Sequence, residues 1–153
     1  DLRSPPDRAK SKMSIARQDM ARYAKRLGIP VNPPPIETDP TPAGAASLYA
    51  QHQGKLREYV VETMRIEWAE GKNIAQEGVL RDIAQRIDLD ADQLINASLD
   101  PSNLTVLQNN FLDAGKDGAI GVPTFIIDGE LFWGQDRIEF VLEKLLEFRA
   151  AKL

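Results

Sequence analysis

The sequence predicts an α/β fold in which a long series of helices is followed by one β-hairpin and a final helix. Apolar residues recur at three- and four-residue intervals from residue 8 to about residue 115, which is the spacing of amphipathic helices. After that stretch the pattern changes. The segments Thr124–Ile127 and Glu130–Trp133 hold β-branched and aromatic side chains and flank Asp128-Gly129, a two-residue hairpin turn.

The composition is that of an ordinary globular domain and excludes several classes of function. The 153 residues are 42% hydrophobic and 27% charged, enough for one domain with a buried core. A net charge of −4 argues against binding of nucleic acid by charge alone. The sequence contains no Cys, so these residues cannot form a disulfide, a thiolate metal site or a Cys-x-x-Cys redox pair. The one His, His52, lies in a polar stretch and is expected at the surface. No apolar run approaches the ~18 residues of a membrane span.

The first two helical segments have clear start and stop signals. We expect a helix over residues 8–27, because Gly28 can adopt the left-handed conformation of a helix end and Pro30 cannot continue the helix. Residues 29–40 are rich in proline and predict an extended connector. Thr41 followed by Pro42 predicts an N-cap, and the helical pattern then continues to about residue 70 with a break near Gly54.

Further apolar patterns predict the rest of the helical region and the final helix. Apolar residues at four-residue steps predict the buried face of the segment near residues 56–68. Trp68 belongs to this face and is expected in the core, and a second apolar stripe covers residues 79–87. Asp90 with Gln93 resembles a capping box, and Asp100-Pro101 predicts the start of a helix that extends to about residue 115. The final helix is expected from about Gln135. The apolar residues of these patterns are Leu56, Val60, Met64 and Trp68; Val79, Leu80, Ile83, Ala84 and Ile87; Leu104, Leu107, Phe111 and Ala114; and Ile138, Val141, Leu142, Leu145 and Phe148.

The hairpin alone does not make a stable sheet. Phe125–Ile127 is apolar without alternation, which is typical of a strand covered on both faces. Since an isolated two-stranded ribbon is marginal in water, further strands are expected from another chain or from sequence upstream of Asp1. We favour upstream sequence. The chain also starts with Asp rather than Met, so Asp1 is not expected to be the natural start.

Two short motifs near the C-terminus carry a resemblance to a known family. Gly121-Val122-Pro123-Thr124 enters the first predicted strand, and Phe132-Trp133-Gly134-Gln135-Asp136-Arg137 opens the final helix. Together they resemble the C-terminal part of the 2-hydroxychromene-2-carboxylate isomerase family, relatives of kappa-class glutathione transferases and DsbA-type oxidoreductases. The resemblance covers nearly the whole chain and implies one thioredoxin-like domain over residues 1–153. Residues 8–115 would form a large helical insertion, and residues 119–153 the C-terminal strand–hairpin–helix half.

The same resemblance implies that the first thioredoxin half is absent from this chain. In the family, that N-terminal strand–helix–strand segment carries the catalytic serine. No catalytic residue is therefore identifiable here, and these residues by themselves are expected to be inactive.

The resemblance implies a glutathione site at Val122 and Pro123. In thioredoxin-like folds the peptide bond before this proline is cis, and the backbone N–H and C=O of the preceding residue pair with the cysteinyl part of a bound thiol peptide. The alternative from local sequence is a trans proline that opens a strand.

Gln135, Asp136 and Lys12 complete the implied site. At a helix start, free N–H groups and the Gln135 side chain could bind the carboxylate of the γ-glutamyl end of glutathione, and Asp136 its ammonium group. Gln135 replaces a serine of kappa-class relatives, and the alternative role of Asp136 is to cap the helix. Lys12 aligns with a lysine that binds the glycine carboxylate of glutathione, and Lys10 is an alternative.

The function implied by resemblance is glutathione-dependent cis–trans isomerisation in the degradation of aromatic compounds. Glutathione would be the cofactor, and the partners would be a small aromatic-derived substrate and a second copy in a homodimer. The resemblance also implies a cytoplasmic protein that binds no nucleic acid, membrane or metal. The alternatives are a DsbA-type thiol-disulfide oxidoreductase, a kappa-type glutathione transferase, and a binding domain without catalytic activity.

Overall fold

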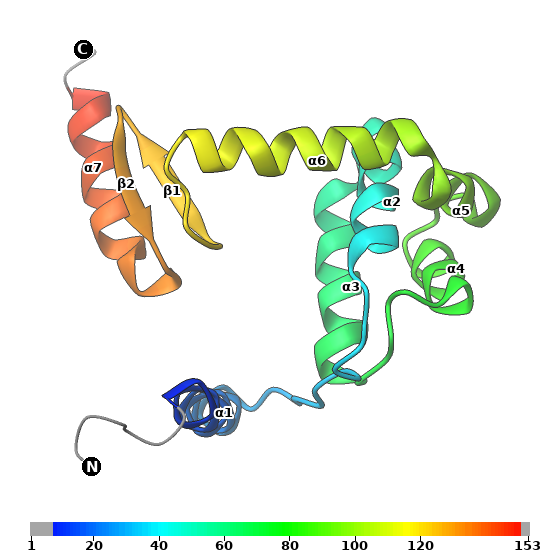
Figure 1. Cartoon of the computed structure of the whole chain (residues 1–153), viewed down its shortest axis with the longest axis horizontal. Coiled ribbons are helices and arrows are strands. Elements are labelled where there is room, and N and C mark those ends of the chain that lie inside the picture. Colours follow the sequence, from blue (N-terminus) through cyan, green and yellow to red (C-terminus); the bar gives the residue numbers. More distant parts are fainter. Residues whose placement is uncertain (1–7, 151–153) are drawn as a thin grey trace. The chain divides into compact units, whose positions relative to one another are not determined.

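The computed structural model describes the backbone of residues 8–150 and the side chains of residues 12–150 (Figure 1). The chain divides into two compact units, one that ends at Leu104 and one that starts at Thr105. The first unit is helical, and the second contains the hairpin and the final helix. The segment expected upstream of Asp1 lies outside the described residues.

The predicted helices of the first unit are all present. The helices are α1 Arg8–Leu27, α2 Thr41–His52, α3 Leu56–Ala69, α4 Glu77–Arg86, α5 Ala91–Leu99 and α6 Pro101–Lys116, the last of which begins in this unit and continues into the second. Gly28 and Gly54 have φ angles of 65° and 70°, a conformation that glycine adopts without steric cost, and they end α1 and separate α2 from α3 as predicted. His52 is exposed, as expected.

The cap of α2 differs from the prediction. Thr41 is the first helical residue rather than the N-cap, which is Pro40. The carboxylate of Asp39 accepts a hydrogen bond from the Thr41 N–H at 2.9 Å, so the side chain two positions upstream satisfies a free donor at the helix start. A hydrogen bond from the Thr41 side chain, together with this backbone bond, holds the pKa of Asp39 below its usual range. At α5 the prediction is confirmed, because the Asp90 carboxylate accepts from the Gln93 N–H at 2.9 Å.

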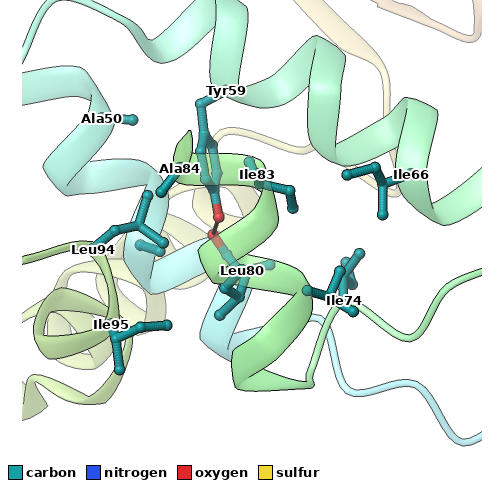
Figure 2. Close-up of a cluster of buried hydrophobic side chains, with 12 residues drawn as sticks. Ala50, Tyr59, Ile66, Ile74, Leu80, Ile83, Ala84, Leu94 and Ile95 are labelled. Atoms are coloured by element: carbon teal, nitrogen blue, oxygen red, sulfur yellow. Dashed lines mark hydrogen bonds between the residues drawn. The ribbon is translucent and has the colours of Figure 1, made fainter. Parts of the chain in front are cut away.

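The core of the first unit lies among α2, α3, α4 and α5 (Figure 2). The apolar stripe predicted for α4 forms part of it, with Ile83 fully buried. Tyr59 of α3 is buried in the same cluster, and its hydroxyl donates to the Ala43 carbonyl of α2 at 2.8 Å. Burial raises the pKa of Tyr59 to about 12. The hydrogen bond satisfies the polar end of a side chain whose ring fills the core.

The buried face of α3 differs from the predicted one by about one position. The helix buries Tyr59, Thr63, Ile66 and Glu67. The predicted stripe is half-exposed instead, and Trp68 is 40% exposed rather than in the core. Tyr59 and Ile66 are buried in place of the predicted stripe because they pack between α2 and α4. The helical spacing of apolar residues does not determine which of two adjacent stripes faces those helices.

The second unit consists of the rest of α6, the strands β1 Thr124–Ile127 and β2 Glu130–Trp133, the 3₁₀ turn η1 Gln135–Arg137 and α7 Ile138–Ala150. Figure 1 shows β1 and β2 side by side with α7 next to them. The strands pair antiparallel, with Phe125 opposite Phe132. Asp128 and Gly129 both have positive φ, at 51° and 79°, so the turn has the left-handed form that suits a tight hairpin.

Within the described residues, α7 covers one face of this hairpin, and the other face is covered only in part. Glu130 lies on the face that also carries Phe125 and Phe132, and it pairs with Lys144 of α7 at 2.9 Å. Helix α7 therefore covers that face. On the opposite face Ile126 and Leu131 are each nearly half-exposed, so the described part of the chain does not bury the strand on both faces as expected. Residues of α6 are not buried either, and Phe111 is 78% exposed.

The described helices can be compared with the requirements of a membrane span. Between residues 8 and 150, no helix combines the length and the apolar composition that a transmembrane span requires.

Glu67 is the charged residue of the α3 buried face. It is 9% exposed. Burial raises the pKa of its carboxyl above its ordinary value, and a hydrogen bond from the Trp68 side chain partly offsets this effect. Because the folded state disfavours the ionised carboxylate, Glu67 lowers the free energy of unfolding at neutral pH.

We predict that Leu94→Ala lowers the free energy of unfolding by about 2–5 kcal/mol, because Leu94 of α5 is fully buried and its loss leaves a cavity. The matched control is Leu99→Ala on the same helix. Leu99 is 68% exposed, so its removal is expected to change stability by less than about 0.5 kcal/mol. Urea denaturation measures both variants, and equal losses would contradict the assignment of the core.

We predict that Glu67→Gln makes the protein more stable at neutral pH. The folded state binds the Glu67 proton more tightly than the unfolded chain, so stability falls as the pH rises from the ordinary value of 4.5 through the raised folded pKa. The advantage of Gln should therefore be largest above the folded pKa and should disappear below pH 4.5. Thermal denaturation at a series of pH values measures it. Glu58→Gln, an exposed change on the same helix, should show no such trend.

Candidate functional site

The loop before β1 presents an unpaired peptide backbone to solvent. Val122 is 94% exposed, and the peptide bond between Val122 and Pro123 is cis, as predicted. In the part of the chain that the structure describes, neither the N–H nor the C=O of Val122 has a hydrogen-bond partner. Val122 can therefore donate one hydrogen bond and accept one from an extended peptide.

A hydrogen bond joins this loop to the start of the final helix. The Gly134 N–H donates to the Pro123 carbonyl oxygen at 2.9 Å. Gly134 has a φ of 107°, in the left-handed region that favours glycine. A Cβ atom at this position would lie 2.5 Å from Oδ1 of Asp136, so the carboxylate folds back over the glycine. Glycine is thus required by both the backbone angle and the close approach of Asp136.

Gln135 and Asp136 begin the final helical segment, as predicted, although the first turn is 3₁₀ before α7 starts. Gln135 is exposed, and its side chain has no partner among residues 12–150. The Asp136 carboxylate pairs with Arg137 at 2.8 Å, and both side chains are at least half-exposed. The sequence pattern assigned no role to Arg137. The structure shows that it holds the Asp136 carboxylate, which keeps lone pairs for a further donor.

The loop also packs against the open face of the hairpin. A Cβ atom at Gly121 would lie 2.9 Å from Nε1 of Trp133, and one at Gly118 would lie 3.2 Å from Cδ2 of Leu131. These two glycines let the loop backbone approach the β2 side chains closely. Trp133 is half-exposed, and its indole lies beside Gly121, the residue that precedes Val122.

An apolar groove includes Val122 in its lining. It has a volume of about 370 Å³ and is formed by the end of α6 and the loop. Ile120 lines it and is largely exposed. The full lining comprises Phe111, Leu112, Ala114, Gly115, Ala119, Ile120, Gly121 and Val122. The groove offers apolar contact to a molecule bound along the Val122 backbone.

The structure therefore brings four of the five predicted site residues into one unit. Val122 and Pro123 meet the segment of Gln135 and Asp136 through the Gly134 hydrogen bond. Lys12 lies exposed on α1 in the first unit, and its role toward glutathione stays a prediction. The side chain of Lys10, the alternative, is outside the described side chains.

The arrangement has the chemical features of a peptide-binding site. Val122 supplies one backbone donor and one acceptor, the start of the final helix supplies N–H groups that favour a carboxylate, and Asp136 supplies an anion that favours an ammonium group. A carboxylate and an ammonium on one carbon are the head group of an amino acid. The groups thus suit a short peptide with a free α-amino acid end.

Comparisons with known proteins show the family and the fold of this chain. Residues 3–146 match the family model of the DSBA-like thioredoxin domain. The 2-hydroxychromene-2-carboxylate isomerase of Sphingobium xenophagum is 26% identical over 136 residues, which cover 89% of this chain and 69% of that protein. A solved structure of a 2-hydroxychromene-2-carboxylate isomerase superposes with a TM-score of 0.80 at 21% identity, over 97% of this chain and 73% of that one. The predicted resemblance and fold class are confirmed.

We predict that Gly121→Ala lowers the free energy of unfolding by roughly 1–3 kcal/mol, because its Cβ would overlap the rigid indole of Trp133. Gly115→Ala is the matched control. It lies in α6 with open space around the position, so it is expected to raise stability by roughly 0.5–1 kcal/mol. Denaturation measures the stability, and the indole N–H resonance of Trp133 should move in Gly121→Ala. A stable Gly121→Ala with an unchanged resonance would contradict the packing described.

Proposed function

Because the chain belongs to the DSBA-like thioredoxin domain family, we propose that it is a glutathione-dependent isomerase of the 2-hydroxychromene-2-carboxylate type, acting in the degradation of aromatic compounds. One observation carries the proposal. The unpaired backbone of Val122 lies next to the start of the final helix, and the Gly134–Pro123 hydrogen bond holds the two together. The similarity to a 2-hydroxychromene-2-carboxylate isomerase over 89% of the chain supports the type of reaction.

Glutathione fits the donors and acceptors of this site. Its cysteinyl residue would pair with the N–H and C=O of Val122 as one strand pairs with another. Its γ-glutamyl carboxylate would accept from the first N–H groups of the final helix and from the Gln135 side chain, and its ammonium would donate to Asp136. Lys12 is proposed to bind the glycine carboxylate.

The proposed reaction consumes no oxidant or reductant. When bound, glutathione would supply a thiolate that can add to the substrate double bond and leave again, so that the bond could rotate in between with no net change of oxidation state. The part played by Val122, Gln135 and Asp136 is to hold glutathione in a single orientation, which lowers the entropic cost of the addition.

Two other functions use a similar fold. A thiol-disulfide oxidoreductase needs a nucleophilic cysteine, and a Cys-x-x-Cys motif in the N-terminal segment that the resemblance implies would select that function, although the Trp133-to-Arg137 motif argues against it. A kappa-type transferase would bind glutathione through the same groups, so assays of isomerisation and of thiol conjugation separate it from the isomerase. The similarity to a 2-hydroxychromene-2-carboxylate isomerase favours isomerisation.

We predict that Asp136→Asn weakens glutathione binding about tenfold or more, because it removes a charge-assisted hydrogen bond to the ammonium group. Isothermal titration calorimetry measures the affinity. The same titration with S-methylglutathione, which keeps the γ-glutamyl end, should show the same loss.

The matched control is Asp128→Asn, at the hairpin turn of the same unit. Asn tolerates the positive φ of this position, so the fold should be unchanged. Unchanged affinity in Asp128→Asn with a clear loss in Asp136→Asn supports the site. Equal affinities in the wild type and in Asp136→Asn would remove the γ-glutamyl assignment.

A further inference from the structure

Helix α1 carries a charge opposite to that of the chain as a whole. Its sequence holds seven basic residues and one acidic residue, so its net charge is +6 within a chain of net charge −4. Among the described side chains, Arg22 pairs with Asp19, whereas Arg17, Lys25 and Arg26 form no ion pair. A helix whose positive charge is not neutralised within the chain favours an anionic partner.

The same helix has an apolar face that the described part of the chain leaves largely uncovered. Apolar residues recur along α1 at three- and four-residue steps, which places them on one face. They are Met13, Ala16, Met20, Tyr23 and Leu27. Met13, Tyr23 and Leu27 are each more than half-exposed. Ile36 of the connector lines a hollow together with Met13 and is 92% exposed. Large apolar side chains exposed together indicate a surface that another molecule covers.

Positive side chains border this apolar face on both sides. Arg17 follows Met13 by four residues and Arg26 follows Tyr23 by three, so the two arginines lie at opposite edges of the face. Tyr23 and Arg26 also line an open hollow of about 230 Å³ together with Arg22 and its partner Asp19. Guanidinium groups beside a phenol hydroxyl suit a phosphate group. Long arginine side chains can place their stems along apolar surface and keep the charge at the polar edge.

We propose that α1 docks the protein on the surface of an anionic phospholipid bilayer. The helix lies in the plane of the bilayer, with Met13, Tyr23 and Leu27 in the interfacial layer and Arg17 and Arg26 on lipid phosphates. A helix with a basic polar face and an apolar face binds such a surface through burial of the apolar side chains and attraction of the charges together. Each of the two contributions is present in the described residues of α1.

A lipid surface fits α1 better than a nucleic acid or a groove in an acidic protein. A nucleic acid binds through charge and leaves the apolar face uncovered, and the remainder of the chain, which is acidic overall, repels it. A protein groove pairs only the side chains that contact it, whereas the field of a charged bilayer acts over about 10 Å and also attracts Arg22 and Lys25. The proposal is independent of the glutathione site, and it differs from the family resemblance, which implied no membrane partner.

Co-sedimentation of the full chain with lipid vesicles tests the proposal. Vesicles of phosphatidylcholine with roughly 30% phosphatidylglycerol should bind the protein about tenfold more tightly than vesicles of phosphatidylcholine alone. Binding to the anionic vesicles should fall about tenfold when the salt concentration rises from roughly 0.05 M to roughly 0.5 M, because salt screens the attraction. Equal binding to the two kinds of vesicle, or binding to neither, would overturn the proposal.

A pair of charge variants separates α1 from the net charge of the chain. The double variant Arg17→Gln with Arg26→Gln should weaken binding to the anionic vesicles about tenfold. The matched control is Arg57→Gln with Arg149→Gln, which removes the same charge from exposed positions outside α1. This control should change the affinity by less than about twofold. Equal losses in the two double variants would show an effect of net charge alone and would overturn the assignment to α1.

A third variant tests the apolar contribution. Leu27→Gln should weaken binding to the anionic vesicles about fivefold with no change of charge. Leu99→Gln on α5 is its control, because Leu99 is 68% exposed and Leu27 is 64% exposed, and it should bind as the wild type does. Circular dichroism of each variant checks that the helices are kept. Binding that depends on Arg17 and Arg26 but not on Leu27 would indicate a nucleic acid or another polyanion and would overturn the lipid proposal.

Discussion

The candidate site depends on one hydrogen bond between two segments that are close in space but lie on either side of the hairpin. The Gly134 N–H donates to the Pro123 carbonyl, so the exposed backbone of Val122 and the start of the final helix keep a fixed distance. The hairpin sets the register of this bond, because Thr124 pairs with Trp133 at the adjacent position. A two-residue turn at the far end of the hairpin leaves little freedom in that register. The exposed backbone of Val122 and the start of the final helix, more than ten residues apart in sequence, therefore lie on one surface.

The fold of the hairpin and of most helices could be predicted from the sequence, because the signals there are local. Turn residues, capping side chains and a change from helical to alternating periodicity depend on neighbours within a few positions. The buried face of α3 could not be predicted in the same way. Tyr59 and the stripe of Leu56, Val60 and Met64 are adjacent on the helix, and the choice between them is made by Ala43 and the other residues of α2 that contact the buried face.

The candidate site shows the same division between local and distant causes. Val122, Gln135 and Asp136 could be named because two short motifs carry a family resemblance, whereas local sequence alone left a trans proline and a helix cap as alternatives. The supporting contacts could not. The approach of Trp133 to Gly121 and the pairing of Arg137 with Asp136 are contacts that only the folded hairpin and helix start define. Glu67 was missed for a related reason, since a glutamate on a helix is ordinarily solvated and its burial depends on the packing of α3.

Within the described residues, the two units carry incompletely paired polar groups of different kinds. In the second unit they are backbone atoms, which cannot be substituted away and which would suit a peptide ligand whatever its side chains. In the first unit they are side chains, the carboxyl of Glu67 and the hydroxyl of Thr38. The Val122 backbone faces solvent, so its free donor and acceptor cost no stability. A buried side chain without a partner does lower the free energy of unfolding, so the two kinds of group have different consequences for the fold.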